Sequence, residues 1–255
     1  MIRAFALVVL AIALVVGGCG DDDGSTVTDT ETTTTTAPAE TADVRVYWLR
    51  DGKVWPAARD VDDSGDIESA AVEELLAGPT EQEETELEFT TAIPEDAENA
   101  EVSIADGVAT VELDTELPEE PLAQLVYTLT QFSTVETVEI QERRLTRADF
   151  EDLTPAILVE SPLSFEEVTS PFTATGTANT FEANFQYELT DTDGLIVDEN
   201  FVTATSGTGT RGTFEFTTDP FTVKFDGIGS LIVFEGSAQD GSRINLVEIP
   251  LRMSK

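Results

Sequence analysis

The sequence has no histidine, and its one cysteine, Cys19, lies near the N-terminus. Without histidine the chain lacks the commonest general base, the Ser-His and Cys-His nucleophile pairs, and the ligand of nearly all zinc sites. With a single cysteine it cannot form an intrachain disulfide or a thiolate metal cluster, so packing alone must stabilise the fold. Enzymes that depend on these groups are therefore excluded.

Positive charge is also scarce. Only 13 Lys and Arg residues oppose 51 Asp and Glu residues among 255, which gives a formal net charge of −38. Residues 43–142 carry −23 of this charge and residues 143–255 carry −10. Such a surface repels nucleic acid and anionic lipid headgroups, so we expect no nucleic-acid partner. The acidity fits salt adaptation or the binding of a cation or partner, and the sequence leaves both explanations open.

Residues 1–18 have the layout of a secretory signal. Arg3 precedes an apolar run over residues 4–16, which is too short to span a bilayer but suits the h-region of a signal. The following Gly17-Gly18-Cys19 resembles a bacterial lipobox. The resemblance implies a lipoprotein signal peptide over residues 1–18 and a lipidated Cys19, which would hold the protein outside the cytoplasm on the outer face of the cytoplasmic membrane. An ordinary secretory signal with an incidental cysteine is the alternative.

Residues 19–42 would then begin with the lipidated Cys19 and continue as a tether. The segment is rich in Thr and acidic residues and has no periodic apolar positions, so it offers nothing to offset the entropy of ordering. We expect it to be disordered, with a reach of roughly 25 to 30 Å.

Residues 43–142 read as an α+β domain. A hairpin is expected around Asp51-Gly52, and a second one, over residues 101–114, around Asp106-Gly107. A helix capped by Asp66 should run to Gly78-Pro79, and another should begin at Pro121, before a last strand near residues 138–140. The predicted order is ββα-ββ-αβ.

Four blocks of this domain resemble the GerMN family of sporulation and spore germination. They are VYWLRDG at 46–52, LLAGPT at 75–80, TAIP at 91–94 and QLVYTLTQF at 124–132. The resemblance implies a fold similar to the ring-building motif of sporulation channels, a role in assembly within the cell envelope, and no catalysis. GerMN modules also occur in lipoproteins of non-sporulating actinobacteria, one of them accessory to a sensor kinase.

Residues 155–253 read as an all-β sandwich. The clearest predicted strand covers residues 181–189, where Phe181, Phe185 and Tyr187 alternate with polar residues. Turn signals separate further runs at residues 214–218, 231–237 and 244–252, so we expect about seven strands. A short connector that follows Arg143-Arg144 and contains Phe150 and Pro155 should join the two domains.

This second domain is similar to the Gmad-type immunoglobulin-like domain, which commonly follows GerMN. The matching blocks are SPF at 170–172, GTA at 176–178, FEAN at 181–184, SAQDG at 237–241 and IPL at 249–251. It differs from antibody-type domains in having neither a cysteine pair nor a tryptophan. Phe and Tyr should therefore supply the buried aromatic mass.

One motif places oxygen ligands at alternate positions, as the start of an EF-hand loop does. Its residues are Asp60, Asp62, Ser64 and Asp66, grouped around a glycine. The position that needs a bidentate Glu is Ala71, so we favour a solvated turn that caps the next helix over a calcium site. No metal and no cofactor is expected.

Trp48 and Trp55 flank the first hairpin turn and are candidates for an exposed aromatic platform. Trp48 shares parity with Val44 and Val46, which favours the core, whereas Trp55 stays open as a binding platform. Neighbouring acids such as Glu73-Glu74 or Glu119-Glu120 carry little information in so acidic a chain, and no catalytic residue is assigned.

The main functional expectation is a non-catalytic, lipid-anchored envelope protein that binds or assembles with envelope proteins or cell wall, self-assembly included. The alternatives are a peptidoglycan-binding or glycan-binding module and an accessory lipoprotein to an envelope sensor kinase. A wall hydrolase is the least favoured, since the chain has no histidine and no recognisable nucleophile motif.

Overall fold

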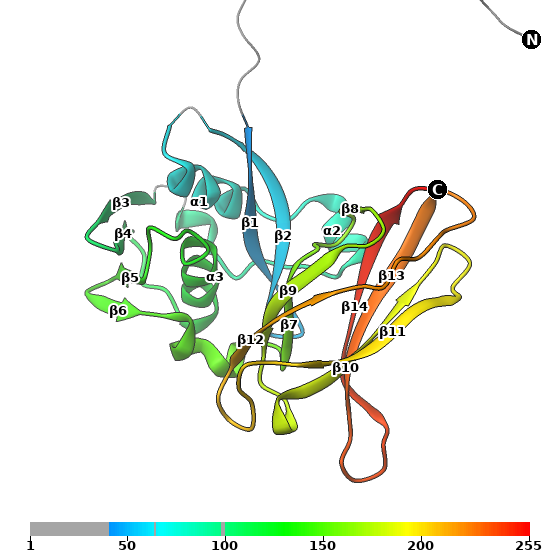
Figure 1. The fold of residues 1–255 in the computed structure, drawn as a ribbon. Coiled ribbons are helices and arrows are strands. Elements are labelled where there is room, and N and C mark those ends of the chain that lie inside the picture. The colour runs from blue at the N-terminus through cyan, green and yellow to red at the C-terminus, as the bar shows by residue number, and fades with distance from the viewer. Residues whose placement is uncertain (1–40, 64, 98–99) are drawn as a thin grey trace, which may run out of the picture. The chain divides into compact units, whose positions relative to one another are not determined.

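Figure 1 shows the computed structural model, which describes residues 41–255 apart from residues 64, 98 and 99. The predicted signal peptide, Cys19 and nearly all of the predicted tether lie outside the described residues. Among the described residues, no helix has the length and hydrophobicity to cross a membrane.

The chain begins with an antiparallel hairpin of β1 (Thr41–Arg50) and β2 (Lys53–Asp62). Its turn is Asp51-Gly52, as predicted, and both turn residues have a positive φ, 53° and 69°. β1 starts two residues before the predicted domain boundary, because Thr41 and Ala42 continue the ladder opposite β2. The prediction that the tether extends to residue 42 is therefore wrong at that end.

Two helices cover this hairpin, α1 (Ile67–Ala77) and α3 (Glu119–Leu129). Asp66 caps α1 as predicted, since its carboxylate accepts a hydrogen bond from the Ser69 N–H at 3.1 Å. Gly78, with φ 89°, ends it. α3 begins two residues before the predicted start at Pro121, and residues 121–129 are all buried.

A short helix, α2 (Glu81–Glu86), was not expected, because its sequence is mostly acidic and has no apolar period. Thr80 and Glu83 form a capping box at its start. Arg59 of β2 pairs with Glu83 at 2.7 Å, and both side chains are largely buried. These local and long-range polar contacts stabilise the helix where hydrophobic periodicity does not.

The second sheet of the first domain has the strand order β3-β4-β5-β6. Its strands are β3 (Glu101–Ala105), β4 (Val108–Glu112), β5 (Thr137–Ile140) and β6 (Arg143–Leu145). α1 and α3 contact both this sheet and the β1–β2 hairpin, so they form a helical layer between the two (Figure 1). β6 lies beyond the end predicted for the first domain at residue 142, because it pairs with β5 and extends the sheet.

The second domain is a β-sandwich, as predicted, with eight strands in the described residues rather than about seven. One sheet has the order β11-β10-β13-β14-β8, and the other has the order β12-β9-β7. The strands are β7 (Ile157–Ser161), β8 (Glu167–Val168), β9 (Thr173–Ala178), β10 (Asn184–Thr190), β11 (Ile196–Thr203), β12 (Gly212–Thr217), β13 (Gly227–Gly236) and β14 (Arg243–Met253).

Phenylalanine and tyrosine fill the space between these sheets, as expected. The Phe185 and Phe214 rings lie 4.9 Å apart edge to face, and Tyr187 stacks on Phe216 at 4.3 Å. Gly176 of β9 lies so close to this core that an added Cβ would be 2.8 Å from the Phe214 ring. The position therefore requires glycine.

The strand predicted over residues 181–189 begins only at Asn184. Phe185 and Tyr187 point inward as predicted, but Phe181 is exposed and starts a short 3-10 turn. Glu182 and Ala183 have positive φ, 52° and 60°, which breaks the extended backbone. The alternation of residue types continues through this break, so the pattern alone could not reveal it.

Candidate interaction surface

The edge of β1 that faces away from β2 is occupied by side chains of α3 and of Gln131, which follows it. Gln131 exchanges two hydrogen bonds with the Arg45 backbone: its amide nitrogen donates to the carbonyl at 2.5 Å, and its amide oxygen accepts from the N–H at 2.7 Å. The Tyr47 N–H donates to Thr128 Oγ1 at 3.2 Å, and Gln124 Nε2 donates to the Tyr47 carbonyl at 2.8 Å. Side chains thus replace a neighbouring strand.

The same edge continues to Leu49, whose N–H and carbonyl both bond to the Thr90 backbone at 2.8 Å. Alternate residues of β1, from Arg45 to Leu49, therefore have their outward backbone groups paired. Gln124, Thr128 and Gln131 all lie in the QLVYTLTQF block, so this block closes the hairpin edge.

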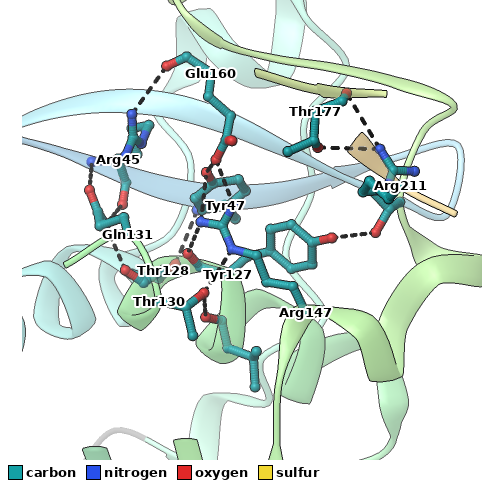
Figure 2. Close-up of polar contacts among 12 residues, drawn as sticks. Arg45, Tyr47, Tyr127, Thr128, Thr130, Gln131, Arg147, Glu160, Thr177 and Arg211 are labelled. Atoms are coloured by element: carbon teal, nitrogen blue, oxygen red, sulfur yellow. Dashed lines mark hydrogen bonds and ion pairs between the residues drawn. The ribbon is translucent and has the colours of Figure 1, made fainter. Parts of the chain in front are cut away.

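The 3-10 helix η2 (Arg147–Leu153) connects the two domains. Its first residue, Arg147, contacts side chains of both domains (Figure 2). The guanidinium of Arg147 forms an ion pair with Glu160 of β7 at 2.8 Å and donates to Thr130 Oγ1 at 2.7 Å. It also lies 4.6 Å above the Tyr127 ring. The Tyr47 hydroxyl donates to the same Glu160 carboxylate.

Burial and charge act in opposite directions on these groups. Burial alone would raise the pKa of Glu160, but Arg147 and the hydrogen bond from Tyr47 together hold that pKa below its usual value. Burial first, and the adjacent Glu160 carboxylate second, raise the pKa of the Tyr47 hydroxyl. Glu160 is therefore ionised and Tyr47 is a hydrogen-bond donor at neutral pH.

A second ion pair holds the other end of the connector. Arg211 contacts both carboxylate oxygens of Glu151, at 2.9 and 3.0 Å, and donates to the Pro155 carbonyl at 2.9 Å. The hydroxyls of Tyr127 and Thr154 lie 2.5 Å apart. These polar groups are used up in contacts with one another, so the arrangement fixes the connector rather than offering a reactive group.

The exposed apolar surface lies elsewhere. All large hydrophobic side chains that the described residues expose belong to the second domain, and Phe201 of β11 is the most exposed at 72%. These side chains are Phe181, Leu195, Ile196, Phe201, Phe225, Ile228, Ile244 and Leu246. Phe181 and Phe201 line the same hollow, and apolar side chains that gather in this way on an acidic surface are typical of a protein–protein contact site.

Comparison with known families agrees with this two-domain architecture. Residues 45–142 match the family described as sporulation and spore germination, and residues 156–242 match the immunoglobulin-like domain of bacterial spore germination. The chain carries a GerMN domain followed by a Gmad-type immunoglobulin-like domain. Neither family description names an enzymatic activity.

A solved structure, the tandem GerMN domains of the sporulation protein GerM from Bacillus subtilis, is 24% identical to the matched part of this chain. The match covers 46% of this chain and 48% of that one, about half the length of each, with a TM-score of 0.37. A search of curated proteins finds no match.

The residues of the predicted metal loop do not lie in one loop. Asp60 and Asp62 belong to β2 of the GerMN domain, Asp66 caps α1, and Ser64 lies outside the described residues. Asp60 instead faces Asp43 across the hairpin, and its carboxyl raises the pKa of Asp43 by hydrogen bonding first and by charge second. Within the described residues, no three potential ligands gather closely enough to hold a metal ion.

The two tryptophans of the GerMN domain do not form an open pair. Trp48 is completely buried. Trp55 is partly buried and packs against the cores of both domains, with the Arg50 guanidinium 4.1 Å from its ring and its indole N–H donating to the Arg50 carbonyl at 3.2 Å. The structure places Trp55 at a contact between the domains, partly covered by Arg50.

The neighbouring acids have ordinary surroundings. Glu74 lies 3.4 Å from Arg59, and Glu119 lies 3.2 Å from Arg143. Glu119 and Arg143 are both well exposed, as expected of a solvated surface pair.

Sequence reasoning missed the two features that organise the molecule. The junction needs Glu160, and the only sequence signal for it is an acid that directly follows the apolar run at the start of β7. The Gmad-type domain's β11 was also missed, because Asp198, Glu199 and Asn200 interrupt its apolar residues and read as a loop.

Proposed function

We propose that the protein is a non-catalytic, lipid-anchored component of the bacterial cell envelope, of the sporulation and germination type. Its GerMN and Gmad-type domains would act as one unit outside the cytoplasmic membrane and bind another envelope protein. The alternatives, a glycan-binding module and an accessory to a sensor kinase, predict different partners for the same unit.

The observation that carries this proposal is the distribution of exposed apolar side chains. In the GerMN domain, α3 occupies the edge of β1 that faces away from β2. In the Gmad-type domain, Phe181, Phe201 and Phe225 each expose more than half of their surface. Aromatic side chains at the centre of an interface contribute much of its binding energy. The Gmad-type domain is therefore the side that would meet the partner.

The junction supports a joint action of the two domains. The Arg147–Glu160 and Arg211–Glu151 pairs hold the connector to the Gmad-type domain. The hydrogen bond from Arg147 to Thr130 holds the connector to the GerMN domain, and the hydrogen bond from Tyr47 to Glu160 joins the two domains directly. A partner bound to the Gmad-type domain would thus be held at a fixed distance from the GerMN domain. This arrangement suits an assembly module, which needs geometry more than a reactive group.

The lipid anchor is a separate part of the proposal and rests on the sequence alone. Residues 4–16 and Gly17-Gly18-Cys19 support it. Mass spectrometry of the native protein should find a polypeptide that begins at an acylated Cys19. An intact Met1 with an unmodified sulfur would overturn this part.

Pull-down from detergent-solubilised envelopes tests the binding role. The protein should recover a specific envelope protein, and replacing Phe201 by Ser should reduce recovery more than replacing Phe225, a comparably exposed side chain at another site. Recovery of no specific partner in any growth phase would contradict the proposal. Sedimentation of the protein with purified cell wall would point to the glycan-binding alternative instead.

A further inference from the structure

The outer edge of β11 has no neighbouring strand in the described part of the chain, because β11 ends its sheet and pairs only with β10. Just beyond it, the Ala204 N–H donates to the Ala183 carbonyl at 2.8 Å. Since backbone groups alternate in direction along a strand, those of Glu199, Phe201 and Thr203 point away from β10. β11 therefore presents a row of open donors and acceptors to solvent.

One of these outward groups has a local partner. The Phe201 N–H donates to the side-chain oxygen of Asn200, its own neighbour, at 2.8 Å. This contact is exposed and involves one flexible side chain. An added strand could replace it with a backbone hydrogen bond.

The side chains of Glu199, Phe201 and Thr203 lie on the solvent face of the sheet. Phe201 is opposite Gln186, and Phe185 and Tyr187 on either side of Gln186 point into the core. Two hollows flank Phe201. One, of about 260 Å³, is lined by Phe181, Gln186 and Gly236 among others, and the second, of about 230 Å³, is shared with Phe234.

The charges on this face are not balanced. Glu199 is directly opposite Glu188 across the β10–β11 pair, an arrangement that is unfavourable for like charges. Arg243 neutralises Glu188 through two contacts, at 2.5 and 2.9 Å, and lies 4.3 Å from the Phe234 ring. Among the described residues, Glu199 has no ion-pair partner of its own.

From this arrangement we infer that β11 accepts, as an added strand, an extended segment of a partner protein in which Lys or Arg lies two residues from a large apolar side chain. In such a pairing, residues two apart on the incoming strand project onto one face. The cation would lie opposite Glu199 and the apolar side chain opposite Phe201. Backbone pairing gives affinity, and these two side chains give specificity. The inference rests on the proposed function and specifies the partner's chemistry.

Charge decides against a second copy of this chain as the occupant. Two copies would each bring a net charge of −38 to the contact. Pairing of two β11 edges would also bring the exposed Glu199 carboxylates of both copies to the same interface. A cationic segment instead supplies a counter-charge to Glu199, which has no ion-pair partner among the described residues.

Short synthetic peptides test the inference with the full chain in detergent micelles. The probe is an acetylated octapeptide, Thr-Lys-Thr-Val-Thr-Lys-Thr-Val, which places Lys and Val alternately on one face. One control peptide replaces both Lys by Glu, and another replaces both Val by Ser. Titration followed by amide chemical shifts should show the probe binding at least tenfold more tightly than either control, with the largest shifts in β11.

Three protein variants locate the site. Glu199→Lys and Phe201→Ser should each weaken binding of the probe at least tenfold, because one reverses the charge and the other removes the apolar contact. Phe225→Ser removes a comparably exposed ring, 63% against 72%, away from β11 and should leave binding unchanged. Circular dichroism on each variant confirms that it is folded.

The inference is overturned if the probe and both controls bind within threefold of one another, if the shifts lie outside β11 and its hollows, or if the protein only dimerises through this edge. Such a result leaves the proposed function standing when an envelope partner is still recovered. Tight, site-specific binding of the probe supports the inference even if no envelope partner is found.

Discussion

Each domain has a strand edge that pairs with no regular strand over most of its length, β1 in the GerMN domain and β11 in the Gmad-type domain. The two edges differ in whether their backbone groups are bonded. In the GerMN domain the outward backbone groups of β1 are bonded to Gln124 and Thr128 of α3 and to Gln131, which follows α3. In the Gmad-type domain the outward groups of β11 face solvent, with one weak local contact from Asn200. The occupied edge belongs to the fold, and the open edge is available to a partner.

The surfaces around the two edges differ in the same way. The GerMN domain carries most of the negative charge, −23 over residues 43–142, and its apolar side chains are packed inside. The Gmad-type region carries −10 over residues 143–255 and exposes every large apolar side chain that lies exposed among the described residues. This contrast indicates that the acidic GerMN domain favours solubility and that the Gmad-type domain, with its exposed apolar side chains, provides the binding surface.

The largest effect should come from the junction that joins these regions. Arg147→Met leaves the Glu160 carboxylate buried without its cation, and we expect a loss of about 3 to 5 kcal/mol in the free energy of unfolding. Chemical denaturation of the full chain measures it. As a control, Arg144→Met removes an exposed pair with Glu139 and should cost about 1 kcal/mol or less. Equal effects of the two variants would show that the junction is not a special source of stability.

The occupied edge should be the next most sensitive region. Gln124 is fully buried, and its amide bonds both the Tyr47 carbonyl and the Ala92 N–H at 2.8 Å. Gln124→Leu leaves both backbone groups unpaired, so we expect a loss of about 2 to 4 kcal/mol, also by chemical denaturation. Gln186→Leu, on the outer face beside β11, is the matched control and should change stability little. A small effect at Gln124 would mean that water or a rearranged backbone can replace its amide.

Acid should weaken the junction in a defined direction. The folded state lowers the pKa of Glu160, so its contribution to stability is complete above the pKa of unfolded Glu and is lost as pH falls through the lower, folded pKa. Glu160→Gln removes this titration. The difference in unfolding free energy between wild type and variant should therefore shrink from pH 6 to pH 3. A difference that is constant with pH would contradict the assigned ionisation of Glu160.

The open edge should tolerate change best. Phe201→Ser removes an exposed side chain and should alter the free energy of unfolding by about 0.5 kcal/mol or less. The same substitution is expected to weaken binding of the probe peptide at least tenfold, so stability and binding separate at this position. A loss of several kcal/mol would instead make Phe201 a structural residue.

Much of the fold could be predicted from the sequence, because local rules determine those parts. Asp51-Gly52 and Asp106-Gly107 mark turns, and Asp66 and Gly78 mark helix ends whatever surrounds them. The short helix α2 could not be predicted, since it depends on Arg59 from a distant strand. The break at Glu182 could not be predicted either, because it lies inside a sequence that alternates like a strand.

The sites were harder to predict than the fold. The hydrogen bonds of Gln124 and Gln131 to β1 join residues more than 70 positions apart, and a single sequence carries no trace of such pairings. The opposite holds for the acidic motif from Asp60 to Asp66. Its spacing suggested a loop, but β2 continues through Asp62 and separates the carboxylates.

Hydrogen exchange at the two edges tests the central claim most directly. With the full chain and no partner, the amides of Arg45, Tyr47 and Leu49 should exchange slowly, since Gln131, Thr128 and Thr90 hold them. Those of Glu199 and Thr203 should exchange within seconds and become protected when the Lys-Val octapeptide is added. Slow exchange at β11 without a partner, or no added protection with the peptide, would show that this edge is not an open docking site.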